Sequence, residues 1–289
     1  MEIAVFGANG QLGRSIQAIA DNYPQYRFIF TDMDTLDITK YNEVAEFVYN
    51  NYPKVFINCA AYTAVDAAEK ERVNVKVINA NAVEHLAQIA AEHNIFLVHI
   101  STDYIYDGMQ YKPYKETDNV HPLSVYGRTK WKGDIAVMKS LCRAVILRTS
   151  WLYSEYGDNF VKTMLTLGKD QSLINVVFDQ IGTPTYARDL AKMIMDVIAQ
   201  REKIQTMETF NYSNEGVASW YDFAVETMQM GKRNCKVLPI NTQQYHTPAK
   251  RPQYAVLDKQ KIKEMFNIEI PYWKDSLRRC IANLEASRV

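Results

Sequence analysis

Short apolar segments alternate with longer amphipathic segments through the first half of the chain. The apolar segments cover residues 3–6, 28–30, 55–57, 96–100 and 144–147. Helical patterns lie near residues 11–22, 40–51, 73–93 and 125–139. Apolar strands without alternation, separated by helices, indicate a parallel sheet that is covered on both faces. The pattern therefore predicts an α/β fold with a doubly wound parallel sheet.

The regular alternation ends near residue 150. Helices are expected near residues 158–168, 186–200, 219–230 and 272–285, and short strands near residues 173–177, 208–212 and 235–239. No repeat or long linker separates the two halves, so we expect them to share a continuous interface. We assign residues 1–150 to the main domain and residues 151–289 mainly to a smaller C-terminal lobe, partly interleaved with the first. Ligands would bind between them.

The composition is that of an ordinary soluble protein. Thirty-three basic residues balance thirty-three acidic ones among 289, so no global field favours nucleic acid or a membrane surface as a partner. The four cysteines are far apart without a C-x-x-C pair, and the five histidines lack metal-ligand spacing. The chain starts with an apolar strand instead of a leader, and no apolar run approaches 18 residues. These features predict a reduced, metal-free cytoplasmic protein.

A glycine-rich segment follows the first strand and opens the first helix. Gly7 permits the tight turn, Gly10 lets a pyrophosphate approach the backbone, and Gly13 lets helix and strand pack closely. This is a Rossmann-like dinucleotide cradle, which makes residues 1–150 the expected NAD(P)-binding domain. The competing interpretation is a turn that needs glycine for geometry only. The residues of the cradle expected to contact the cofactor are Gly7, Asn9, Gly10, Gln11, Leu12 and Gly13.

Asp32 closes the second strand, 25 residues after Gly7, near the place where a carboxylate binds the adenosine ribose hydroxyls. Its charge would repel a 2′-phosphate and no arginine follows it directly, so the sequence favours NADH while also allowing NADPH. Asp37 and Ile38 are expected to contact the adenine side. Asp37 could equally cap the helix that starts near Lys40.

Tyr126 and Lys130 are four residues apart on an expected helix, so their side chains share one face. A neighbouring ammonium favours the phenolate, and we expect Lys130 to lower the pKa of Tyr126 and to contact the nicotinamide ribose. Thr102 lies at the carboxyl end of the strand at residues 96–100, where ligands bind in such sheets.

These three residues suggest a mechanism of carbonyl reduction. A hydride would leave the nicotinamide of NADPH or NADH for a substrate carbonyl, while Tyr126 delivers a proton to the oxygen and Thr102 donates a hydrogen bond to it. The alternative is that Ser101 and Thr102 cap a turn and Tyr126 packs in the core.

Seven segments carry a resemblance to a known family: residues 10–13, 59–66, 101–104, 126–130, 148–153, 179–185 and 247–252. Along nearly its whole length the chain resembles the extended short-chain dehydrogenases/reductases and, within them, the dTDP-4-dehydrorhamnose reductases. The resemblance implies that NAD(P)H reduces the C4 keto group of dTDP-6-deoxy-L-lyxo-4-hexulose to give dTDP-L-rhamnose. It implies that Ala60, Ala61 and Tyr62 line the cofactor. It also implies that Val65, Tyr104 and Trp151 touch the sugar. We expect further substrate contacts from Thr102, Asp103 and Tyr126. Trp151 could instead be a core tryptophan.

Two departures concern the nucleotide contacts, because Lys250 and Ala255 stand where the family often has arginine and serine. Sugar-nucleotide dehydratases of this fold typically show Thr-Asp-Glu, whereas Tyr104 follows Asp103 here. A bifunctional epimerase-reductase would need a Cys and a His, and no His shares the motif of Cys142. A non-catalytic protein similar to the regulatory subunit of methionine adenosyltransferase stays open from the fold alone. A homodimer is a further possibility.

Overall fold

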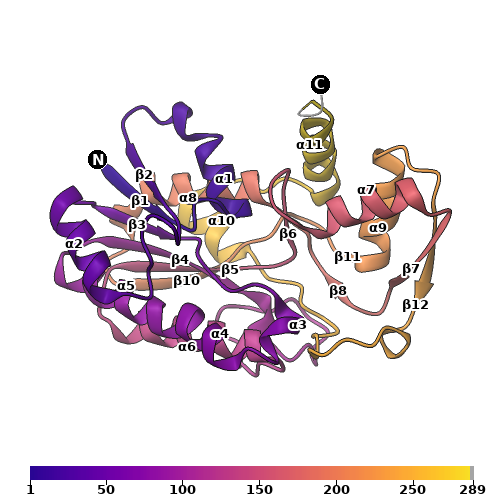
Figure 1. Ribbon diagram of the computed structural model, residues 1–289, viewed down its shortest axis with the longest axis horizontal. Helices are drawn as coiled ribbons and strands as arrows, with labels where there is room; N and C mark the ends of the chain where they lie inside the picture. The colour runs from indigo at the N-terminus through magenta and orange to yellow at the C-terminus, as the bar shows by residue number, and fades with distance from the viewer. Residues whose placement is uncertain (287–289) are drawn as a thin grey trace.

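The computed structural model describes residues 1–286 and contains a six-stranded parallel sheet in the order β10-β5-β4-β3-β1-β2 (Figure 1). Its strands are β1 Glu2–Phe6, β2 Arg27–Thr31, β3 Val55–Asn58, β4 Phe96–Thr102, β5 Ala144–Thr149 and β10 Met207–Asn211. All five strand pairings are parallel. The predicted α/β, Rossmann-like doubly wound fold is confirmed.

Each central strand contributes side chains to two cores, which explains why the strands show no polar alternation. Ile3 and Val5 pack in the core beneath α1 (Gln11–Gln17), α8 (Ala187–Ala199) and α10 (Gln260–Phe266). Ala4 and Phe6 point to the opposite core, beneath α2 (Tyr41–Asn51), α5 (Ala82–Glu92) and α6 (Val125–Lys139). Successive side chains of a strand face opposite ways, so a strand covered on both faces must be apolar throughout.

The smaller part of the molecule lies beyond the carboxyl edge of the large sheet (Figure 1). Its helices are α7 Phe160–Asp170, α9 Trp220–Met230 and α11 Trp273–Ala286. Three two-stranded sheets accompany them: β7 Leu173–Val177 with β12 Lys236–Ile240, β8 Ile181–Gly182 with β11 Ala218–Ser219, and β6 Leu152–Tyr153 with β9 Thr185–Tyr186. Because α8, β10 and α10 return to the large sheet, the C-terminal half is interleaved with it. The division of function at residue 150 stays a prediction.

The expected helix at residues 73–93 is interrupted in the structure. It consists of α4 (Arg72–Lys76), a π-helical segment η2 (Val77–Asn81) and α5. Gly133 of α6 packs so closely on this segment that an added Cβ would lie 2.4 Å from the Asn79 carbonyl oxygen. Single π turns within helices often mark functional sites. The expected helix at residues 11–22 also ends early, at Gln17.

The remaining elements are short. They are α3 (Val65–Ala68) and the 3₁₀ turns η1 (Ala20–Asn22), η3 (Asp103–Ile105), η4 (Arg201–Lys203) and η5 (Thr242–Gln244). No helix within residues 1–286 combines the length and apolar character needed to cross a membrane.

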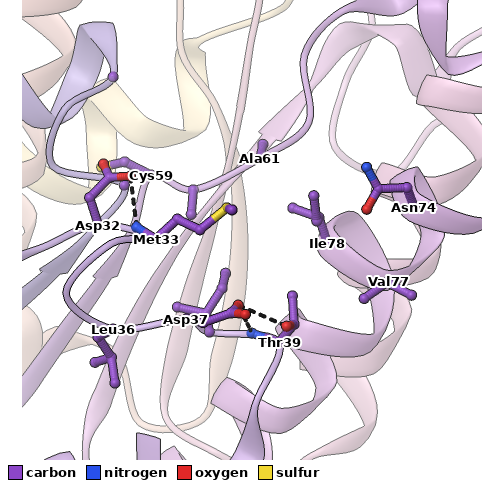
Figure 2. Close-up of a pocket in the computed structure, with 14 residues that line it drawn as sticks. Asp32, Met33, Leu36, Asp37, Thr39, Cys59, Ala61, Asn74, Val77 and Ile78 are labelled. Atoms are coloured by element: carbon purple, nitrogen blue, oxygen red, sulfur yellow. Dashed lines mark hydrogen bonds between the residues drawn. The ribbon is translucent and has the colours of Figure 1, made fainter. Parts of the chain in front are cut away.

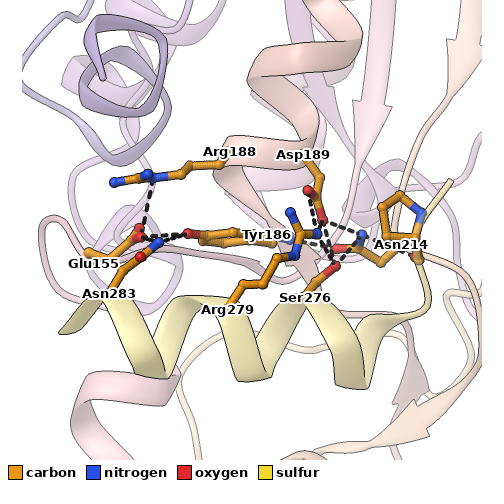
Figure 3. A network of polar contacts seen from close by, with 9 residues as sticks. Glu155, Tyr186, Arg188, Asp189, Asn214, Ser276, Arg279 and Asn283 are labelled. Atoms are coloured by element: carbon orange, nitrogen blue, oxygen red, sulfur yellow. Dashed lines mark hydrogen bonds and ion pairs between the residues drawn. The ribbon is translucent and has the colours of Figure 1, made fainter. Parts of the chain in front are cut away.

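A buried polar network fastens α11 to α8 (Figure 3). The Asp189 carboxylate is 5% exposed and accepts hydrogen bonds from Asn214, Ser276 and Arg279. A second carboxylate, Glu155, accepts from the Tyr186 hydroxyl and from Asn283 beside it. Two buried acceptors therefore hold the last helix in place.

We expect Asp189→Ala to lower the free energy of unfolding by about 2–4 kcal/mol, because two buried donors lose their acceptor. Asp275→Ala is the matched control, since the Asp275–Arg278 pair is 63% and 66% exposed and such pairs contribute about 0–1 kcal/mol. Urea denaturation of both variants measures the difference. Equal destabilisation would contradict the assignment.

Candidate active site

The glycine cradle lies over the carboxyl ends of β1 and β3, beside a cleft of about 400 Å³ (Figure 2). Gly7 has φ +74°, and a Cβ there would lie 2.6 Å from the Ala60 nitrogen. A Cβ at Gly13 would lie 2.4 Å from the Gly7 carbonyl oxygen. At Gly10 the nearest atom would be 3.4 Å away, so this glycine leaves open space toward the cleft. The three glycines therefore allow both the turn and a close approach of a ligand to the backbone.

About half of the residues expected at the cofactor line this cleft. Those on its wall are Gly7, Gly10, Asp32, Asp37, Ile38, Ala60 and Ala61. The wall also contains residues that the sequence did not single out: Met33, Leu36, Thr39, Cys59, Asn74, Val77 and Ile78. Leu12 and Gly13 are buried beneath the cradle, where Leu12 packs in the core.

The two aspartates on the wall have different partners. Asp32 accepts from the backbone N–H of Asn9 at 2.7 Å and from that of Met33 at 2.8 Å. It thus places a negative charge at the rim while it holds the cradle. Asp37 accepts from the backbone and hydroxyl of Thr39. The N-cap of α2 is Lys40 without a side-chain cap, so the capping interpretation of Asp37 is wrong: its carboxylate closes a turn instead.

Gln11 directs its side chain away from the cleft. Its Oε1 accepts from the Ser154 hydroxyl and from Asn159 Nδ2, both at 3.0 Å, and its Nε2 donates to the Leu152 carbonyl. The side chain therefore joins the cradle to the segment that begins the smaller part of the molecule. This leaves the backbone of Gln11, rather than its amide, for a cofactor.

Asn79, in the π-helical segment, fixes the backbone of Tyr62. Its Oδ1 accepts from the Tyr62 N–H at 2.8 Å and its Nδ2 donates to the Tyr62 carbonyl at 3.0 Å. Val65 begins α3 just beyond this segment. Sequence reasoning missed Asn79, because a single amide within a helical pattern carries no signal.

The structure brings Thr102, Tyr126 and Lys130 together at the end of β4. Thr102 is the last residue of β4, and Tyr126 lies in the first turn of α6, whose N-cap Ser124 accepts from the Gly127 N–H. The Tyr126 phenol is hydrogen-bonded to Thr102. A Cβ at Gly127 would lie 2.2 Å from the Tyr104 carbonyl oxygen, so this glycine lets α6 approach the turn after β4. The Tyr104 ring meets the Tyr126 ring edge-on, with centroids 5.6 Å apart.

Burial raises the pKa of Tyr126 to about 12, against the lowering effect of the Thr102 hydrogen bond. The phenol therefore keeps its proton at neutral pH. The expected lowering of this pKa by Lys130 is wrong for the described structure. The ammonium instead donates to the Ile100 carbonyl at 2.6 Å, and burial lowers the pKa of Lys130 to about 8.

Asp103 lies beneath the site, not on its surface. It is 1% exposed, and one carboxyl oxygen accepts from the Thr102 hydroxyl at 3.1 Å. Burial raises the pKa of Asp103 to about 7, although the Thr102 hydrogen bond opposes the shift. Its expected contact with substrate has no support in this geometry.

Trp151 stands at the start of the smaller part, in a left-handed conformation with φ +46°. Its indole stacks on Trp220 with ring centroids 3.6 Å apart, and a Cβ at Gly182 would lie 2.7 Å from it. The ring is half-buried and packs at the edge of the C-terminal core. It is therefore neither a fully buried core tryptophan nor a free one, and its contact with sugar stays a prediction.

A second cleft, of about 600 Å³, lies against Arg251. Arg251 forms a two-pronged ion pair with Asp66, at 2.7 and 3.1 Å, and the Ala249 N–H donates to the same carboxylate. The guanidinium lowers the pKa of Asp66 and also forms a hydrogen bond with Tyr104. The polar and charged residues of the lining include His121, Gln180, Thr242, His246, Lys250 and Arg251. The second cleft thus adjoins the tyrosine site through Tyr104.

The parallel sheet, the glycine cradle and the Thr102–Tyr126–Lys130 site define an NAD(P)-dependent oxidoreductase of the extended short-chain type. A family model, described as the RmlD substrate binding domain, matches residues 1–286. The dTDP-4-dehydrorhamnose reductase of Aggregatibacter actinomycetemcomitans is 39% identical over 98% of this chain and 99% of its own. The chain belongs to the dTDP-4-dehydrorhamnose reductase family.

Solved structures agree with this assignment. A dTDP-4-dehydrorhamnose reductase of Clostridium acetobutylicum is 41% identical and superposes with a TM-score of 0.94, covering 99% of this chain and 100% of that one. The Bacillus anthracis enzyme, in complex with NADP, is 37% identical with a TM-score of 0.93, covering 98% and 99%.

We expect Asp32→Asn to shift the cofactor preference toward NADPH by about tenfold, equivalent to about 1.4 kcal/mol, because it removes a negative charge from the cleft wall at the place expected to bind the adenosine ribose. The ratio of kcat/KM values for NADPH and NADH measures the shift. Asp34→Asn is the matched control, because Asp34 is exposed and absent from the cleft wall. An unchanged ratio in Asp32→Asn would remove Asp32 from cofactor selection.

Turnover should decline as pH rises through about 8, because the Lys130 ammonium loses its proton there. The sign follows from the lowered pKa: the charge is present below this pH and lost above it. A profile of kcat/KM between pH 6 and 10 tests the expectation. Constant kcat/KM up to pH 10 would show that Lys130 stays charged or that its charge is unused.

Proposed function

We propose that this chain uses NADPH or NADH to reduce the C4 keto group of dTDP-6-deoxy-L-lyxo-4-hexulose, giving dTDP-L-rhamnose. The observation that carries the proposal is the meeting of Thr102, Tyr126 and Lys130 beside the glycine cradle. Full-length similarity to dTDP-4-dehydrorhamnose reductases supports the substrate.

The chain's own residues fit a dinucleotide. Gly10 leaves open space toward the cleft, and the wall of this cleft includes both Asp32 and Ala61. A bound nicotinamide supplies the hydride. Lys130 is placed to hold the ribose hydroxyls, and Asp32 is placed to hold those of the adenosine ribose. The NADP in the Bacillus anthracis relative supports this use of the cleft.

Tyr126 supplies the proton in this proposal. Its raised pKa keeps the phenol protonated, so it can transfer the proton to an oxygen that becomes alkoxide-like as the hydride arrives. Thr102 turns its hydroxyl from Asp103 to the same oxygen and stabilises the developing charge. The phenolate that remains afterwards regains a proton from solvent.

The second cleft is suited to the nucleotide diphosphate. Lys250 and Arg251 bring two positive charges to its wall, against the one carboxylate of Asp107 among its lining residues. Tyr104, whose ring meets that of Tyr126, and the Trp151–Trp220 stack offer aromatic faces suited to a deoxysugar ring. Residues 151–289 thus act mainly as the substrate lobe. A homodimer and a cytoplasmic location stay predictions from the sequence.

The alternatives have less support. A dehydratase would need a base where Tyr104 follows Asp103, and the Tyr104 hydroxyl is engaged with Arg251. A purely regulatory protein would not require Thr102, Tyr126 and Lys130 to meet at the end of β4. Purified protein mixed with NADPH or NADH and the 4-keto nucleotide sugar decides between these roles, because only the reductase consumes reduced cofactor.

Tyr126→Phe should lower kcat by about 10²–10⁴-fold and leave the Kd for NADPH within about twofold, because one hydroxyl is lost and the cradle is untouched. Tyr111→Phe removes the same atom from a ring that is 83% exposed and serves as the matched control. Stopped-flow kinetics and cofactor fluorescence supply the two quantities. Full activity of Tyr126→Phe would show that another group donates the proton.

A further inference from the structure

Side chains of β3, β4, β5 and α6 form one buried polar cluster below the catalytic residues. Asp134 lies on α6 one turn after Lys130, and Tyr126, Lys130 and Asp134 occupy positions i, i+4 and i+8 of one helix face. Asp134 is 0% exposed and Lys130 is 2% exposed. A buried charge is costly unless other groups compensate it. Lys130 and Asp134 therefore each need a compensating partner.

The Asp134 carboxylate pairs with one cation, Arg148, and lies one helical turn from a second, Lys130. Its Oδ2 accepts from the Ser101 hydroxyl of β4 at 2.9 Å and lies 3.5 Å from Nε of Arg148 on β5. Arg148 is itself 1% exposed and donates to the Tyr106 hydroxyl and the Glu116 carbonyl. The negative charge of Asp134 also raises the pKa of Lys130, which opposes the lowering of that pKa by burial.

The second carboxyl oxygen of Asp134 has no hydrogen-bond partner among the described residues. It faces Nε2 of His99 at 3.7 Å, which is too long for a hydrogen bond. Asn58 accepts from the Ala60 N–H through Oδ1, so its amide group donates to Nδ1 of His99. The imidazole hydrogen therefore lies on Nε2, toward Asp134. Burial lowers the pKa of His99 well below its usual range, so the ring is neutral.

The groups that face Lys130 and Asp134 come from every packed element. They are Cys59 after β3, His99 and Ser101 on β4, Arg148 on β5 and Tyr126 on α6. Cys59 and His99 are uncharged, because burial raises the pKa of the thiol and lowers that of the imidazole. Asp134 is thus the carboxylate that pairs with Arg148 and lies one helical turn from Lys130 on the same face of α6.

We infer that Asp134 is a positioning residue of this reductase: its buried carboxylate, one helical turn from Lys130, keeps the Lys130 ammonium charged. The role rests on the proposed function, since it concerns the working range of the same site. Ser101 and Arg148 hold the carboxylate in place. The cluster also reaches the cofactor wall through Asn58 and Ala60.

The test compares the pH profile of kcat/KM for Asp134→Asn with that of the wild-type enzyme. The amide keeps the shape but loses the charge, so the alkaline decline should move to lower pH by about one unit. The kcat/KM of the variant should therefore be about tenfold below that of wild type on the alkaline side of the profile. The difference should be smaller at pH 6. Asp134→Glu should restore the wild-type position.

Ser101→Ala is the matched control, because it removes a hydrogen bond of Asp134 but leaves the charge. Its alkaline decline should stay at the wild-type pH. A readout without turnover is the Kd for NADPH against pH, which should weaken at lower pH in Asp134→Asn than in wild type. Coincident profiles of Asp134→Asn and wild type in both measurements would overturn the inference.

If Asp134→Asn fails to fold, the Arg148→Gln variant tests the role of Asp134 instead. Removing the competing cation leaves the carboxylate to Lys130, so the alkaline decline should move to higher pH, and an unchanged position would overturn the inference. Failure of the proposed function is recognised separately, since wild-type protein would then not oxidise NADPH with the keto-sugar nucleotide at any pH.

Discussion

The burial of charge on one face of α6 is the constraint on which the active site depends. Lys130 and Asp134 lie almost without solvent contact against the carboxyl ends of β3, β4 and β5. Charges in such a place persist only with partners of good geometry. This explains why apolar strands end in polar residues such as Asn58, Ser101 and Arg148. The same packing fixes Tyr126 next to Thr102, so stability and catalytic geometry have a common origin.

Contacts across the two parts of the molecule connect the cofactor and substrate clefts. Gln11 joins the cradle to Ser154 and Asn159, and Asp66 joins α3 to Arg251. Both contacts cross from the large sheet to the smaller part within a few residues of a cleft. The cradle and the substrate lobe therefore share polar contacts in addition to their apolar interface.

The fold was largely accessible from the sequence, because strands covered on both faces leave a clear apolar signature. The five strands of the N-terminal half and the main helices lie where the pattern predicted them. The π-helical turn at Val77–Asn81 escaped prediction, since its cause is the close approach of Gly133 from a distant helix. The return of β10 to the sheet likewise depends on tertiary packing.

The site was accessible in part. Motif spacing identified Gly7, Thr102, Tyr126 and Lys130, whose relative positions follow from a strand end and a helix turn. Spacing could not reveal burial, which reverses the expected effect on the pKa of Tyr126 and places Asp103 below the surface. Nor could it reveal Asn79 or Asp134, because a single amide or carboxylate on a helix gains its role only from neighbours on other elements.

The central claim is that Tyr126 and the bound cofactor together reduce a keto group at C4 of the sugar. Reaction with NADPH that carries deuterium on the transferred position of nicotinamide C4, followed by NMR of the sugar nucleotide, tests it most directly. The account predicts product with deuterium at C4 of the sugar. Oxidised cofactor without deuterium at that carbon, or no cofactor oxidation at all, would contradict it.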